Sequence, residues 1–297
     1  VYNVFTAVVY GVGFLSLFLV LVPLRQCLTQ RDLPLYIIFA LFLPFIYFIF
    51  PGPVGFMQRE SLILMMIMPY IVSTVVLRLN VKTALSLRVA IGLFAGLGFS
   101  IKPHYLLLLL ACESVMMLER RTWLSWLRAE VLAIGAVLCA FFIMMLVLTP
   151  NYLTQMLPQT LLLYVGSSSI RSISIFDRLI KFKIYYILMC FMLVVSLLSQ
   201  RFSRGALSVL TRSFLVAIGA MFVAQMSMTM AYFYQIVPLL SLCVLLSILC
   251  ASLLFVVVFE APKKMVLGIL IAVPFFLNLF IFQHRLRGDY YLLVNKW

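Results

Sequence analysis

Acidic residues are scarce in this sequence, with 8 Asp and Glu against 22 Lys and Arg, so that the formal net charge is +14. Charged residues make up only 10% of the chain, whereas a soluble domain carries roughly 25%. With 66% hydrophobic residues, the chain lacks the polar side chains needed to cover a surface in water. Lipid must therefore surround most of the chain, and a soluble domain is excluded.

Motifs of common enzyme chemistry are also missing. The sequence has no P-loop, no Ser/His/Asp set, and no CxxC or other metal-ligand spacing. A divalent metal stays open as a cofactor, but no cluster of ligands for it is visible. The cysteines lie mostly within apolar runs and are expected to pack as small buried hydrophobes; they are Cys27, Cys112, Cys139, Cys190, Cys243 and Cys250.

The sequence does contain a series of apolar runs, many of them near the roughly 20 residues that span a bilayer. They predict an all-α polytopic membrane protein of about nine or ten transmembrane helices, with residues 1–297 forming a single transmembrane domain. The predicted spans are Val4–Leu24, Leu33–Phe50, Ser61–Leu77, Val89–Ile101, His104–Leu118, Val131–Leu148, Ile184–Leu198, Ser213–Met230, Phe233–Phe259 and Met265–Phe282.

One apolar stretch, residues 89–118, is too long for one comfortable span and short for two. A single helix would also place Arg88 and Arg120 on opposite sides of the membrane. Because a proline disfavours helix at the residue before it, we predict a break at Lys102–Pro103, with two short helices meeting on the outer side. Irregular backbone at membrane depth is tolerated where it lines a cavity or is buried in protein.

The connecting segments differ in charge and thereby predict the orientation. Thirteen basic residues fall in one alternating set of short connections and nine in the other, so the positive-inside rule places the first set in the cytoplasm. Val1 then lies outside, and we expect the chain to lack an N-terminal span and first outer loop. Since the cations sit between apolar segments, topology and anionic membrane lipid explain them, and no nucleic-acid partner is expected. The first set is Arg25, Arg31, Arg78, Lys82, Arg88, Arg120, Arg121, Arg128, Arg201, Arg204, Arg212, Lys263 and Lys264.

Polar residues on the predicted outer side are the candidates for function. Arg59 and Glu60 open the third span, where the helix dipole alone would explain Glu60 and a bound substrate group would explain both. Lys102 and His104 lie at the predicted break, where a lysine either snorkels to the interface or binds an anion.

Two further outer segments supply candidates. Residues 150–183 are predicted to be an amphipathic outer loop that carries Arg171. Residues 232–235 open the ninth span, where the tyrosines form either an aromatic belt or the mouth of a site. The candidate substrate-binding residues are therefore Arg59, Glu60, Lys102, His104, Arg171, Tyr232, Tyr234 and Gln235. Glu113 is assigned no chemistry and is expected to pair with a cation or to lie near the cytoplasmic end.

Four short motifs, Gln58–Glu60, Gly96–Pro103, Arg120–Trp123 and Tyr232–Pro238, together resemble those of the C-type (GT-C) membrane glycosyltransferases. Within them the chain is similar to the bacterial family 39 group, near protein mannosyltransferases and the lipid A aminoarabinose transferase. The resemblance implies a GT-C-like fold with outer interfacial helices. It also implies transfer of a hexosyl or pentosyl group from a polyprenyl-phosphate donor to an acceptor, at the periplasmic face of a bacterial inner membrane.

The resemblance also implies roles for individual residues. Lys102, Arg59 and Arg171 would hold the lipid phosphate, and Glu60 matches a carboxylate that the family often has at that helix start. The catalytic Asp of the family has no counterpart here and is expected upstream of Val1, so this chain alone is expected to be inactive without it. The alternatives are a transporter or flippase of a phosphate-bearing lipid or solute, and an inactive GT-C relative or scaffold. Convergence of the outer residues on one site would favour the transferase.

Overall fold

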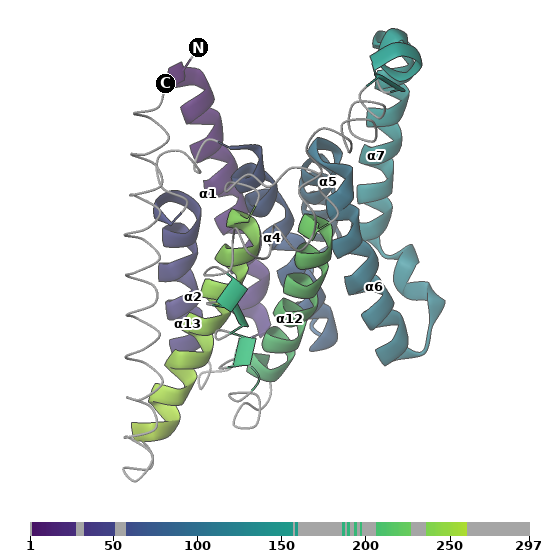
Figure 1. Ribbon diagram of the computed structural model, residues 1–297. Coiled ribbons are helices and arrows are strands. Elements are labelled where there is room, and N and C mark those ends of the chain that lie inside the picture. Colours follow the sequence, from purple (N-terminus) through teal and green to yellow (C-terminus); the bar gives the residue numbers. More distant parts are fainter. Residues whose placement is uncertain are drawn as a thin grey trace.

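The computed structural model (Figure 1) describes residues 2–27, 33–50, 58–156, 206–226 and 236–259, with isolated positions at 158, 159, 186, 187, 189, 190, 193, 194 and 197. Every regular element in these ranges is a helix. The all-α fold class is thus confirmed for this part of the chain, while the total number of spans stays a prediction. The predicted runs Ile184–Leu198 and Met265–Phe282, apart from the isolated positions, lie outside the described residues.

The helices follow the predicted runs closely. The long helices are α1 (Tyr2–Cys27), α2 (Leu33–Pro44, extended by a π-helix at Phe45–Ile49), α4 (Arg59–Arg78), α5 (Leu85–Ile101), α6 (Leu106–Arg120), α7 (Ala129–Leu148), α12 (Ala206–Met226) and α13 (Val237–Phe259). Short 3-10 helices cover Pro103–Tyr105 and Trp123–Leu127, and a π-helix covers Tyr152–Met156, the described start of the predicted outer loop.

The predicted start of one helix was wrong. We expected a span from Ser213, but α12 already begins at Ala206, and Arg212 lies inside it. The helix can continue through this cation because Leu210 is buried on one face while Arg212 is exposed on another.

Among the described residues, four helical segments are long and apolar enough to cross a membrane: Val4–Cys27, Arg59–Arg78, Ala129–Leu148 and Ser208–Met226. Shorter apolar helices are Phe39–Ile49, Leu85–Ile101 and Val237–Leu249. Large apolar side chains such as Phe14, Phe18 and Val147 are exposed on the outermost helices. These surfaces suit contact with lipid, and the described part of the chain is consistent with an α-helical membrane protein.

Helix α4 lies at the centre of the described bundle. Nearly all of its residues from Glu60 to Val76 are buried, and it contacts α1, α5, α6, α12 and α13. Helix α7 packs along α5 at one edge, as Figure 1 shows. The helix start that carries Arg59 and Glu60 therefore sits against the rest of the protein and is not an isolated surface feature.

Glycines on α5 allow its two neighbours to approach closely. A Cβ added at Gly92 would lie 2.4 Å from the carbonyl oxygen of Glu130 on α7, and one added at Gly96 would lie 2.8 Å from Val137. Gly92 and Gly96 are four residues apart and share one helix face, the small-residue spacing typical of tightly packed membrane helices. Gly98 faces α4, where an added Cβ would lie 2.9 Å from Met66.

The predicted break at Lys102–Pro103 is confirmed. Helix α5 ends at Ile101, Lys102 has extended backbone angles (φ −143°, ψ 96°), and Pro103 opens the 3-10 turn that leads into α6. The backbone N–H of Tyr105 donates a 3.1 Å hydrogen bond to the carbonyl of Lys102. The proline therefore separates two helices that a purely apolar run would have joined.

The packing of α5 against α7 makes a prediction about stability. Gly92→Ala places a methyl group against the α7 backbone, and overpacking of this kind destabilises by about 1–3 kcal/mol. We expect a thermal midpoint several degrees lower in detergent micelles, measured by size-exclusion chromatography after heating. Gly135→Ala on α7 is the control, because an added Cβ there meets nothing within 4 Å. Equal losses in both variants would contradict the close approach.

Candidate functional site

Glu60 and Lys102 form an ion pair at the helix break. Lys102 Nζ contacts Glu60 Oε1, and the Glu60 side chain is only 1% exposed. Close packing of α4 and α5 around Gly98 brings the start of one helix beside the end of the other. We call Glu60 and Lys102 the helix-break pair. Glu60 also lies in the first turn of α4, where the helix dipole favours a negative charge.

Polar atoms beside the helix-break pair are not fully satisfied by the described residues. Glu60 Oε2, His104 Nε2 and the Tyr105 hydroxyl are buried without a hydrogen bond to this part of the chain. The His104 and Tyr105 rings lie 4.6 Å apart between centroids. His104 lies in the short turn between α5 and α6, two residues after Lys102, which supplies the cation at this point.

The other predicted site residues are placed differently. Arg59 lies in the first turn of α4 beside Glu60, but its side chain is exposed. Arg171, Tyr232, Tyr234 and Gln235 lie outside the described residues. The structure thus brings Glu60 and Lys102 into contact, with His104 two residues away along the chain. It does not show Arg59 converging with them.

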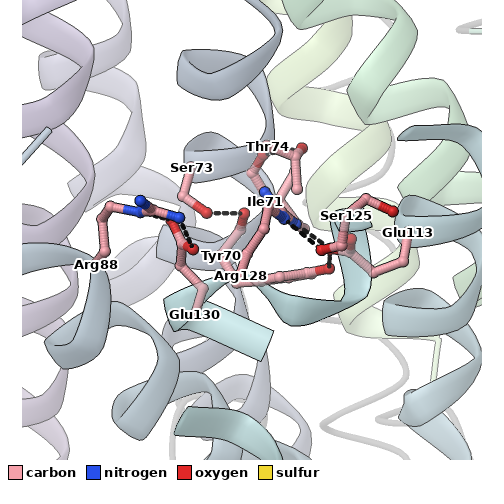
Figure 2. A network of polar contacts seen from close by, with 9 residues as sticks. All are labelled: Tyr70, Ile71, Ser73, Thr74, Arg88, Glu113, Ser125, Arg128 and Glu130. Atoms are coloured by element: carbon pink, nitrogen blue, oxygen red, sulfur yellow. Dashed lines mark hydrogen bonds and ion pairs between the residues drawn. The ribbon is translucent and has the colours of Figure 1, made fainter. Parts of the chain in front are cut away.

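A second buried polar group lies further along α4. It confirms that Glu113 pairs with a cation, whereas the sequence did not indicate that Arg128 and Tyr70 would be its partners. The Tyr70 hydroxyl donates a 2.5 Å hydrogen bond to Glu113 Oε1 on α6. Arg128 Nη2 contacts the same oxygen, and Figure 2 shows both side chains reaching Glu113. Glu113 is fully buried and Arg128 is 8% exposed. We call Tyr70, Glu113 and Arg128 the buried triad.

The turn between α6 and α7 explains how Arg128 reaches the bundle. Arg121 has a positive φ of 51° that ends α6, and Thr122 caps the following 3-10 helix by accepting a 3.2 Å hydrogen bond from the N–H of Leu124. The chain then turns back, so that Arg128 precedes α7 and its Nε donates to the carbonyl of Ser125 at 3.0 Å. The expected cytoplasmic loop is therefore partly folded against the protein.

Further ion pairs join helix ends at the same side. Arg88 makes two 2.8 Å hydrogen bonds to Glu130, which is 1% exposed. Arg78 lies 3.1 Å from Glu119 and donates a 2.9 Å hydrogen bond to Ser213 on α12. Several of the basic residues that predicted the orientation thus form ion pairs within the protein. The sequence indicated this possibility, because the same basic segments also contain carboxylates.

Within the described residues, no three His, Cys, Asp or Glu side chains gather as metal ligands. No protein-family model, curated protein or solved structure matches this chain, so the site has to be interpreted from its own geometry. At the helix break, a lysine and a carboxylate stand next to unsatisfied polar atoms. Such a group has the chemistry to bind a phosphate and to accept a proton.

The buried triad makes a stability prediction. Glu113→Gln leaves the Arg128 charge buried without a carboxylate, which costs about 3–5 kcal/mol when a buried pair is broken. Glu119→Gln on the same helix is the matched control, because the Glu119 side chain is 43% exposed and its partner Arg78, although 7% exposed, keeps its hydrogen bond to Ser213. We expect a much lower midpoint in denaturant for Glu113→Gln than for Glu119→Gln.

Adding Arg128→Gln to Glu113→Gln removes the unpaired charge and should recover part of the lost stability. If the double variant is as unstable as the sum of the single variants, the charges act independently, and the assignment of the pair is wrong.

Proposed function

We propose that this chain is the membrane core of a glycosyltransferase that moves a sugar from a polyprenyl-phosphate donor to an acceptor at the outer face of the membrane. The observation that carries the proposal is the helix-break pair. It places a cation for a phosphate and a carboxylate for an acceptor side by side at one end of the bundle. The motif resemblance gives Lys102 the phosphate role, and it matches Glu60 to a carboxylate that the family often has at this helix start.

The pair is suited to exchange partners when a donor binds. The Lys102 side chain is 14% exposed, whereas Glu60 is almost fully buried, so an approaching phosphate meets the ammonium group first. Arg59 is exposed at the same helix start and does not converge with the pair, and in this proposal its side chain turns toward the phosphate as a second cation. As the Lys102 ammonium moves to the phosphate, its contact with the Glu60 carboxylate is released. Donor binding thereby frees the carboxylate for the acceptor.

The proposed reaction is a substitution at the anomeric carbon. The acceptor oxygen forms a bond to that carbon, and the bond from the carbon to the phosphate oxygen breaks. The polyprenyl phosphate leaves with the bonding electrons, and Lys102 and Arg59 stabilise its charge. The acceptor proton moves to a carboxylate. Among the described residues, Glu60 is the only carboxylate at this end of the bundle.

The second candidate function is a transporter or flippase for a phosphate-bearing lipid or solute. The turn between α5 and α6, which carries Lys102 and His104, is the observation that favours it, because irregular backbone at membrane depth lines a cavity or is buried in protein. Both functions use Lys102 to hold a phosphate. They differ in whether the bond between sugar and phosphate is broken, and a transfer assay separates them on that basis.

The transfer assay uses bacterial membranes that carry the protein expressed from its full reading frame, supplied with a panel of radiolabelled polyprenyl-phosphate sugars. Lys102→Ala should lower transfer about 100-fold or more, as loss of one charge-stabilising group does elsewhere. Lys102→Arg keeps the cation and should recover part of the activity. Arg121→Gln removes an exposed cation at the other end of the bundle and is the control.

The assay has separate outcomes for each part of the proposal. Loss of transfer in Glu60→Gln would support Glu60 as the base, and undiminished transfer would assign the base to another carboxylate. Absence of transfer from every donor, together with movement of a labelled lipid phosphate across the membrane, would replace the transferase with the flippase.

The proposed orientation is tested separately. In a cysteine-free background expressed in a bacterium, Arg59→Cys should react with a membrane-impermeant maleimide in cells whose outer membrane has been permeabilised. Arg121→Cys should react only after the inner membrane is broken, because the basic segments face the cytoplasm. The reverse pattern of labelling would place the helix-break pair on the cytoplasmic side and contradict the use of an outward-facing lipid donor.

A further inference from the structure

A cavity of about 330 Å³ lies at the end of the bundle opposite the helix-break pair. Helix α4 separates the two, because Glu60 and Leu77 lie about 25 Å apart along its axis. The cavity is formed by the end of α4, the link to α5 and the end of α6. Its lining residues are Leu77, Asn80, Val81, Lys82, Thr83, Arg88 and Arg120, so it has three cations and no carboxylate.

The ion pairs around the cavity leave an excess of positive charge. Glu113, Glu119 and Glu130 are the described carboxylates at this end, and they pair with Arg128, Arg78 and Arg88 respectively. Five described cations at this end then have no carboxylate partner among the described residues: Arg25, Lys82, Arg120, Arg121 and Arg212. Two of these five, Lys82 and Arg120, line the cavity. Part of the unbalanced charge thus lies where there is space for a ligand.

The protein holds part of this cationic lining in place. Arg120 Nη2 donates hydrogen bonds to the carbonyl of Leu77 and, at 3.4 Å, to Asn80 Oδ1. Asn80 has a positive φ of 57°, which turns the chain after α4 and brings Lys82 beside these groups. Helix α5 begins at Leu85, shortly after the lining residue Thr83, and its N-terminal dipole adds to the positive potential. Arg88 is fixed by Glu130.

We propose that this cavity binds a phosphate group, supplied by the headgroup of an anionic membrane lipid or by free inorganic phosphate. Guanidinium and ammonium groups around a pocket without carboxylates are the chemistry that recognises phosphate oxygens. The basic end of a membrane protein also faces the leaflet in which anionic lipids accumulate. The proposed site is separate from the helix-break pair and does not depend on the transferase proposal.

Native mass spectrometry of the purified chain in detergent tests this site. The probes are phosphatidylglycerol, phosphatidylcholine and inorganic phosphate. The wild-type protein should retain phosphatidylglycerol in preference to phosphatidylcholine. A basic residue contributes about 1 kcal/mol to binding of an anionic lipid, which is roughly fivefold in affinity. Lys82→Gln should therefore lower retention about fivefold, and Lys82→Gln with Arg120→Gln about 25-fold.

Two variants, Arg121→Gln and Lys82→Gln, separate binding at the cavity from a general effect of removing a positive charge. Arg121→Gln removes an adjacent exposed cation that does not line the cavity, and should change retention less than about twofold. Lys82→Gln changes only an exposed side chain, so it remains informative if the double variant fails to fold. Competition by excess inorganic phosphate would identify free phosphate as the ligand, and its failure to compete would identify the lipid. Equal losses in Lys82→Gln and Arg121→Gln, or no preference for the anionic lipid, would overturn the proposal.

Discussion

Burial of carboxylates inside an apolar helix bundle is the constraint on which the described structure depends. Glu60, Glu113 and Glu130 are each at most 1% exposed, and each contacts a cation from another segment. An unpaired charge in such surroundings costs several kcal/mol, so the two partners must be brought together as the helices assemble. The pairs thereby set the position of α5 on α4, of α7 on α5, and of the turn before α7 on α6.

The buried charges at the two ends of the bundle differ in how many other contacts surround them. Several contacts hold the helices together at the end of the bundle where α4 ends. They are three ion pairs, the Tyr70 hydroxyl and the glycines on one face of α5, and they connect α4 to α7 and α12. Moving one charge there would disturb several others. At the helix break, one ion pair stands among polar atoms that have no hydrogen bond to the described residues. A cation can leave its carboxylate for a ligand only if few other contacts change at the same time. The helix-break pair satisfies this condition and the buried triad does not.

The sequence predicts those features that local chemistry determines. Apolar runs located the helices, and Pro103 located the break, because both effects act over a few residues. Glu60 and Lys102 were each selected as charges beside a span, but their contact depends on the packing of α4 on α5. For a similar reason, a cation partner was expected for Glu113, but Arg128 and Tyr70 were not identified as its partners. Arg128 follows the short segment Trp123–Leu127, and nothing in that segment indicates that it folds back against α6.

The break at Pro103 connects the sequence to the proposed chemistry. If the helix continued through Lys102, its side chain would follow the helical spacing of α5, and Pro103 would remove a backbone hydrogen bond from the helix interior. The extended conformation at Lys102 instead turns the ammonium toward the start of α4, where Glu60 neutralises it. A lysine has a compact charge on a flexible chain, so it can leave Glu60 for a phosphate without moving either helix. A proline, a lysine and a glutamate thus hold one buried ion pair at the end of the bundle, and in the proposed function a phosphate would replace the glutamate as the partner of Lys102.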